Sequence, residues 1–256
     1  MEIREAVPHR RARSLALAGV AFFFGLWCLL SYAGLVPDVI LPSPTEVVRA
    51  FPVLHFEEAL VRSAGWSLYR VTMGFLLAAA VAIPLGILMG TFPPIRHFFA
   101  PILDPLRFLP ISALVPLTIV WFGIEEMQKV MFLFVGTVVY LLPLVVDAVA
   151  KVDTVYLQTA TTLGASRWQA VRHVLIPGSL PAIGDALRVM NGIGWTYVIL
   201  AEVINARYGL GALITVAGKR SHVDQIFALV VVILAIGMVT DQVIRLVNQK
   251  LFFWKE

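Results

Sequence analysis

The sequence predicts an all-α polytopic membrane protein with about six transmembrane helices, and two observations lead to that prediction. The 256 residues are 59% hydrophobic and only 14% charged, with a mean hydropathy of +0.87, whereas soluble domains are about 25% charged. Six apolar stretches are each close to or above the ~20 residues that cross a bilayer core: about 14–33, 66–91, 98–122, 129–149, 181–203 and 226–247. We therefore expect one integral membrane domain over 1–256.

The first apolar stretch, 14–33, follows a basic amino terminus with Arg4, Arg10, Arg11 and Arg13. A secretory signal peptide has an apolar region of only about 7–15 residues followed by a small-residue cleavage site. The stretch is longer than that and no clear site follows it. We interpret it as an uncleaved first span.

The third stretch, 98–122, contains four prolines, at 101, 105, 110 and 116. Each proline removes a backbone donor and clashes with the preceding helical turn. Broken helices persist in a membrane only where protein or water satisfies the freed carbonyls. We expect an irregular span that faces the protein interior, at least in part.

The distribution of Lys and Arg predicts that both termini are cytoplasmic. Eleven basic residues fall on the inner side in this orientation and six on the outer side, so loops 34–65 and 204–225 are extracytoplasmic. The inner ones are Arg4, Arg10, Arg11, Arg13, Arg96, Lys151, Arg167, Arg172, Arg245, Lys250 and Lys255. The net charge of +4 thus serves orientation and contact with anionic lipid, and we expect no nucleic-acid partner.

The segment 152–177 predicts a cytoplasmic helix–turn–helix between the fourth and fifth spans. The first helix ends at Gly164, which suits a left-handed residue, and Ser166 with Gln169 forms a capping box that starts the second. Pro177 is expected to end the second helix. The expected apolar faces comprise Val152, Tyr156, Ala160 and Leu163, then Trp168, Val171 and Leu175. Small residues at the turn favour docking of a partner, with an interfacial connector as the alternative.

This segment resembles the EAA loop of binding-protein-dependent ABC importer permeases, whose pattern is Glu-Ala-Ala, three residues, Gly, nine residues, Ile-x-Leu-Pro. Ala160, Gly164 and Pro177 match that pattern in place and spacing. Gln158 and Thr159 depart from it, and Val174 and Ile176 are apolar replacements. The departure at position 158 puts a specific ion pair there in doubt.

Further segments are similar to the nitrate, sulfonate, taurine and bicarbonate branch of that family. They occur in the family's order, at Leu41–Pro44, Ser67–Phe75, Pro116–Gly123 and Ala201–Glu202 followed by Gly209–Gly211. The resemblance covers nearly the whole chain. It implies a type I, MetI-like permease fold.

The resemblance implies a permease subunit of the bacterial inner membrane, paired as a homodimer, that forms the path for a small solute. The solute class would be an anion such as nitrate, bicarbonate, sulfonate or taurine. A solute-binding protein would deliver it, and a separate cytoplasmic ATPase would hold ATP and magnesium, with no cofactor on this chain. The residues implied to couple to the ATPase are Gln158, Ala160, Gly164, Ala165, Ser166, Arg167, Trp168 and Pro177.

Charged residues inside the expected spans are costly in lipid and need partners or functions. Asp104 with Arg107 and Asp185 with Arg188 lie three apart, a spacing that favours local pairing. Arg70 and Glu202 lie near outer span ends, where side chains reach the interface. For the substrate path the candidates are Asn191, Trp195 and Glu202.

Catalysis and nucleotide binding by this chain are not expected. Six residues separate Gly211 from Gly218 and Arg220 follows Lys219, which does not match a phosphate-binding loop. The single cysteine, Cys28, excludes an internal disulfide, and the five histidines are scattered. The alternatives are a secondary transporter driven by an ion gradient, a membrane enzyme and a structural subunit. The proline-rich span is compatible with the first of these, because such transporters use broken helices.

Overall fold

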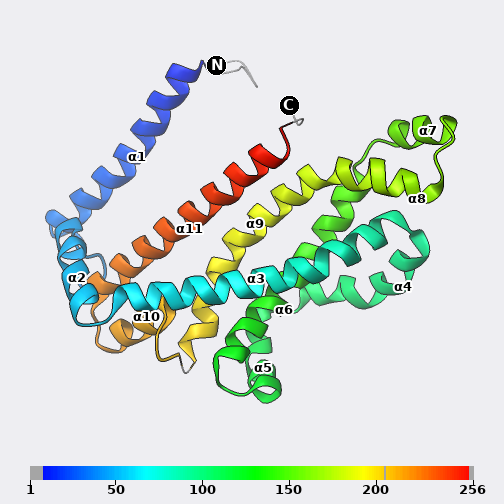
Figure 1. Ribbon diagram of the computed structural model, residues 1–256. Helices are drawn as coiled ribbons and strands as arrows, with labels where there is room; N and C mark the ends of the chain where they lie inside the picture. Colours follow the sequence, from blue (N-terminus) through cyan, green and yellow to red (C-terminus); the bar gives the residue numbers. More distant parts are fainter. Residues whose placement is uncertain (1–7, 205, 254–256) are drawn as a thin grey trace. The chain divides into compact units, whose positions relative to one another are not determined.

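A computed structural model describes residues 8–204 and 206–253, and this part of the chain is helical without strands (Figure 1). Arg4 and Lys255, which entered the charge argument, lie outside it. The α-helices are α1 (His9–Tyr32), α2 (Pro44–Phe56), α3 (Leu60–Thr91), α4 (Pro93–Leu103), α5 (Val115–Phe122), α6 (Glu126–Ala150), α7 (Thr154–Thr162), α8 (Arg167–Ala170), α9 (Ile176–Val203), α10 (Leu210–Lys219) and α11 (Val223–Leu251). The described residues also form three shorter elements: two 3₁₀-helices, η1 (Asp104–Phe108) and η2 (Ile111–Leu114), and a π-helical turn, η3 (Val171–Leu175).

The chain divides into two compact units. The first comprises residues 1–59 and 214–231, of which the described part holds α1, α2, the end of α10 and the start of α11. The second comprises residues 60–213 and 232–256 and holds, among its described residues, all of α3 to α9 and most of α11.

In the first unit, the motif Leu41–Pro44 starts α2. Ser43 forms a capping box with Glu46, whose carboxylate accepts the backbone N–H of Ser43 at 2.7 Å. That hydrogen bond holds the pKa of Glu46 below its usual value. The indole N–H of Trp27 donates to the carbonyl of Pro42 at 2.9 Å, and its ring stacks on Phe227. These contacts fix the turn between α1 and α2.

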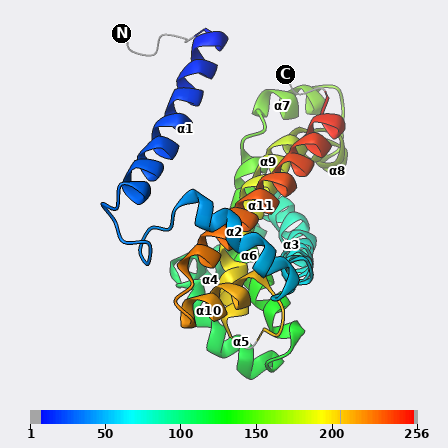
Figure 2. The same ribbon diagram turned by 90° about the vertical axis from the view of Figure 1, so that its left-hand side faces the viewer.

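In the second unit, α3 packs along α6, and both contact α9 (Figures 1 and 2). The face of α3 toward α6 carries a small residue at every fourth position: Gly74, Ala78, Ala82, Gly86 and Gly90. A Cβ at position 74 would lie 2.6 Å from Leu133 Cβ, and one at position 86 would lie 2.6 Å from Val145 Cγ1. The absence of side chains there lets the two backbones approach closely, as small residues do in membrane helix pairs.

Gly74→Ala is expected to destabilise the protein by about 1–3 kcal/mol, because the added methyl group overlaps Leu133 and a backbone carbonyl of α6. The matched control is Gly65→Ala in the same helix, where a Cβ meets nothing within 4 Å. Thermal unfolding of the purified protein in detergent measures both. Equal melting temperatures for the two variants would contradict the close packing of α3 on α6.

Among the residues that the structure describes, four helices are long and apolar enough to cross a membrane: α1 from Arg10, α3, α6 and α11. The α4–η1 and η2–α5 segments form a fifth candidate as a bent pair. The count is therefore four or five by length and composition, below the six predicted. The fifth predicted stretch lies in the 28-residue α9, where Asp185, Arg188 and Glu202 interrupt the apolar run.

The proline-rich stretch is broken, as predicted. The chain bends by 101° between Phe108 and Ile111, where Pro110 cannot donate a helical hydrogen bond. Burial is limited to a few side chains, and Ile111 and Val115 pack with Phe132 and Ala201. The expectation of an inward face thus holds for part of the stretch only.

Candidate functional site

The loop 152–177 folds as the predicted helix–turn–helix. Gly164 adopts a φ of +84°, and the N–H groups of Gly164 and Ala165 donate to the carbonyls of Thr161 and Ala160. This pairing is the Schellman motif that ends a helix. Ser166 Oγ accepts the N–H of Gln169, and Gln169 Oε1 accepts the N–H of Ser166 at 2.8 Å. The turn is therefore held by its own short-range bonds.

The second helix does not end at Pro177, and that prediction is wrong. Helical structure continues from Arg167 through α8, η3 and α9 to Val203. Proline cannot donate to the carbonyl four residues earlier, and the turn before it widens: the N–H of Ile176 donates to the carbonyl of Val171, five residues back. Such a π-helical turn accommodates the hydrogen bond that Pro177 cannot form, so the loop continues into α9 without a break.

The inner side of the loop is anchored on the ends of two other helices. Val171 and Leu175 are buried against Val149 of α6, with Ile87 and Phe92 near the end of α3 packed against the same cluster. Trp168, which was expected to share this apolar side, is instead 62% exposed. It precedes the buried Val171 by about one turn.

The outer side of the loop is an exposed surface that we term the coupling face, residues 154–168. Three large apolar side chains lie open on it: Tyr156 is 63% exposed, Leu163 83% and Trp168 62%. A Cβ at Gly164 would meet nothing within 4 Å, so the turn is open to an approaching surface. Of the predicted coupling residues, Gln158, Gly164, Ser166, Arg167 and Trp168 are exposed, and Ala160, Ala165 and Pro177 are half-buried.

Beside the coupling face lies an apolar groove of about 630 Å³ between α7 and the start of α9. Tyr156, Ala160 and Leu163 line it from α7 and the turn, and Val174 and Pro177 line it from the other side. Exposed apolar patches of this kind mark surfaces that meet a partner.

Two of the predicted path residues, Asn191 and Trp195, are buried and bonded within the chain. The Asn191 amide and the Trp195 indole both donate to Thr240 Oγ1 of α11, at 3.0 and 3.2 Å. These bonds join α9 to α11. A role of these two residues in the substrate path stays a prediction.

The third, Glu202, belongs to a buried ion network, and the expectation that Arg70 and Glu202 reach the interface is wrong. Both side chains are at most 1% exposed. Arg70 Nη1 donates to Glu202 at 2.7 Å, while its Nε and Nη2 donate to Glu126 at 2.7 and 2.8 Å. Ser67 Oγ donates to Glu202 at 2.7 Å. A buried charge needs a partner of this kind.

The network also fixes the loop that follows α9. The N–H groups of Leu210 and Gly211 donate to Ser67 and Glu202, and the Tyr208 carbonyl accepts from Arg70 at 2.7 Å. A Cβ at Gly209 would lie 2.5 Å from the Glu202 carboxyl. The two parts of the motif, Ala201–Glu202 and Gly209–Gly211, are therefore held together by this network. Sequence reasoning missed Ser67 and Glu126, although two opposite charges inside spans were a signal that they pair.

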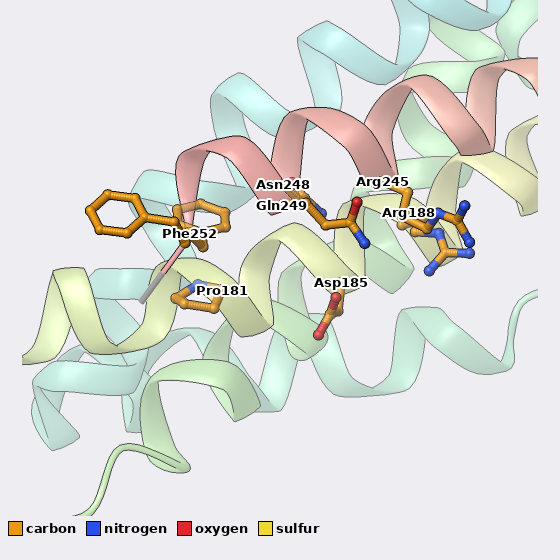
Figure 3. A pocket seen from close by; sticks show the side chains of 8 residues that line it. Pro181, Asp185, Arg188, Arg245, Asn248, Gln249 and Phe252 are labelled. Atoms are coloured by element: carbon orange, nitrogen blue, oxygen red, sulfur yellow. The ribbon is translucent and has the colours of Figure 1, made fainter. Parts of the chain in front are cut away.

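Near the middle of α9, Arg188 pairs with α11. Its Nε and Nη2 donate to the Asp241 carboxylate at 2.6 and 2.8 Å, a bidentate partner that the sequence analysis did not predict. A groove of about 490 Å³ lies beside this pair, with Arg188 and Arg245 at one end and Pro181 and Phe252 at the other (Figure 3).

The family model described as "binding-protein-dependent transport system inner membrane component" matches residues 82–253. The chain belongs to this family. A Methanocaldococcus jannaschii protein named as an ABC transporter permease is 37% identical over 85% of this chain and 84% of its own length. The taurine transport system permease TauC of Escherichia coli is 29% identical over 96% of this chain and 92% of its own. The bicarbonate transport system permease CmpB of Synechocystis is 30% identical over 88% and 83%.

The fold of the permease also matches a solved structure, an inward-facing MetNI methionine ABC transporter. The TM-score is 0.63 at 19% identity, over 78% of this chain and 96% of the other. The match confirms the predicted MetI-like fold, and the family confirms an ABC importer permease over the secondary transporter considered above. Among residues 8–204 and 206–253, no group of His, Cys, Asp and Glu could hold a metal ion.

Proposed function

We propose that the permease works as a homodimer in a bacterial inner membrane, with both termini cytoplasmic, and that a separate cytoplasmic ATPase binds the coupling face. ATP and magnesium would bind to that ATPase and not to this chain. An extracytoplasmic solute-binding protein would deliver the solute. The resemblance of 158–177 to the EAA loop and the excess of basic residues on the same side of the membrane support this arrangement.

The observation that carries the proposal is the continuous helical path from Arg167 to Val203. A displacement of the coupling face passes into α9 without a flexible joint. Because Val171 and Leu175 pack on the ends of α3 and α6, the displacement also reaches those two helices. The motion then reaches the Arg70–Glu202 network at the far end of α9.

The names of the relatives support a proposal for the solute class. TauC and CmpB are named for taurine and bicarbonate transport, and we propose a small solute of this range, such as nitrate, bicarbonate, a sulfonate or taurine. Asn191, Trp195 and Glu202 are proposed to contribute to the path when α9 moves.

The test is uptake by the permease reconstituted in proteoliposomes with its ATPase and its binding protein. We expect accumulation of at least one of these solutes with ATP and magnesium inside the vesicles, and none with a proton or sodium gradient alone. A catalytically inactive ATPase serves as the control. Uptake driven by an ion gradient without ATP would overturn the proposal.

A further inference from the structure

A small charged groove of about 200 Å³ lies in the second unit, between α3, α6 and the α4–η1 segment. Four charged side chains line it: Arg96 of α4, Asp104 and Arg107 of η1, and Asp147 of α6. The remaining lining is mostly apolar and includes Met89, Leu142 and Pro143. The groove thus presents two cations and two anions in one small volume.

Within residues 8–204 and 206–253, these four charges have no partners of opposite sign. Among the residues that the structure describes, none of the four side chains forms an ion pair or a hydrogen bond, and all four are exposed. The Arg107 guanidinium lies 5.3 Å from the ring of its neighbour Phe108. In contrast, Arg70 and Arg188 each donate to a carboxylate. The predicted local pair of Asp104 with Arg107 is absent.

The groove lies beside the second half of α6, where Leu142, Pro143, Val146 and Asp147 line it. The Tyr140 hydroxyl donates to the carbonyl of Arg107 at 3.2 Å. Tyr140 lies ten residues before Ala150, the last residue of α6, or about 15 Å along the helix axis. If α6 leaves the hydrocarbon core at Ala150, and since that core is about 30 Å thick, we place Arg107 near its middle. Exposed charges at that depth face an aqueous path rather than lipid.

We propose that this groove is a solute-binding section of the translocation path, and that it takes a short zwitterion, an amino acid or an aminosulfonate. The inference rests on the proposed function and narrows its solute class. Asp104 and Asp147 repel a simple anion, and Arg96 and Arg107 repel a simple cation. A solute that carries one anionic and one cationic group can bind both kinds of side chain. The arginine guanidinium groups would donate hydrogen bonds to its sulfonate or carboxylate, and the aspartate carboxylates would accept hydrogen bonds from its ammonium.

The test uses the full-length permease in nanodiscs, with Cys28→Ser and a reporter cysteine in the groove, Ala100→Cys or, in a second variant, Leu103→Cys. A charged, water-soluble thiol reagent is expected to modify the reporter, because the groove holds water. Taurine and β-alanine are expected to slow the modification. Ethanesulfonate, propionate and ethylamine at the same concentration are expected to leave the rate unchanged.

The charged residues are tested in the same background. Arg107→Gln and Asp104→Asn are each expected to abolish protection by both zwitterions while the protein elutes as a single species. Lys250→Gln, an exposed charge near the end of α11, is the matched control and is expected to retain protection.

Three results would overturn the inference: no modification of either reporter, no protection by either zwitterion, or equal protection by ethanesulfonate and taurine. The first would mean that lipid or a second copy covers the groove, and the last would assign a simple anion. Protection is measured without ATPase or binding protein, so failure of the proposed function would appear separately, in the proteoliposome assay.

Discussion

Arg70→Met is expected to leave little stably folded permease. The substitution removes the cation from a site where Glu202 is 0% exposed and leaves the Tyr208 carbonyl without its donor. Removal of one partner from a buried ion pair costs about 3–5 kcal/mol. The midpoint of thermal unfolding in detergent, followed by size-exclusion chromatography, measures the loss.

The second variant separates charge from packing. Arg70→Met combined with Glu202→Gln leaves no buried carboxylate unpaired and is expected to recover part of the lost stability. The control is Arg220→Met in the first unit, whose pair with Glu58 is 55% exposed on the Arg220 side, because exposed ion pairs contribute little. A melting temperature of Arg70→Met equal to that of Arg220→Met would show that the network does not hold these helices.

Gly164→Trp is expected to abolish ATP-driven uptake while the permease still folds and inserts. A Cβ at position 164 would meet nothing within 4 Å on this chain, so we expect the bulky side chain to obstruct a docking partner rather than the fold. The left-handed φ of +84° adds local strain of about 1–2 kcal/mol. Copurification of the ATPase and uptake in proteoliposomes measure the effect.

The matched control is Gly164→Asn, since asparagine tolerates the left-handed conformation and is small. It is expected to retain ATPase binding and most of the uptake. Normal uptake by the tryptophan variant would mean that the coupling face does not meet the ATPase. Loss in both variants would point to backbone strain at the turn rather than to docking.

Features of short range were predictable from the sequence. Gly164 and the Ser166–Gln169 capping box define the loop because each bond closes within a few residues. Pro110 breaks its span for the same local reason. The prediction for Pro177 failed because a local rule ends a helix at proline, whereas the observed π-turn, anchored by buried Val171 and Leu175, carries the helix past it.

The sequence alone determined the helical membrane class, the break in the third stretch and the turn of the coupling face, because apolar run length, proline and caps act through neighbouring residues. Tertiary structure decided the partners of the intramembrane charges. Arg70 meets Glu202 across 132 positions, and Arg188 meets Asp241 across 53. A charge in the membrane requires a partner, but only helix packing selects which of several candidates lies within bonding distance, and which charges, like those around Arg107, are left facing a groove.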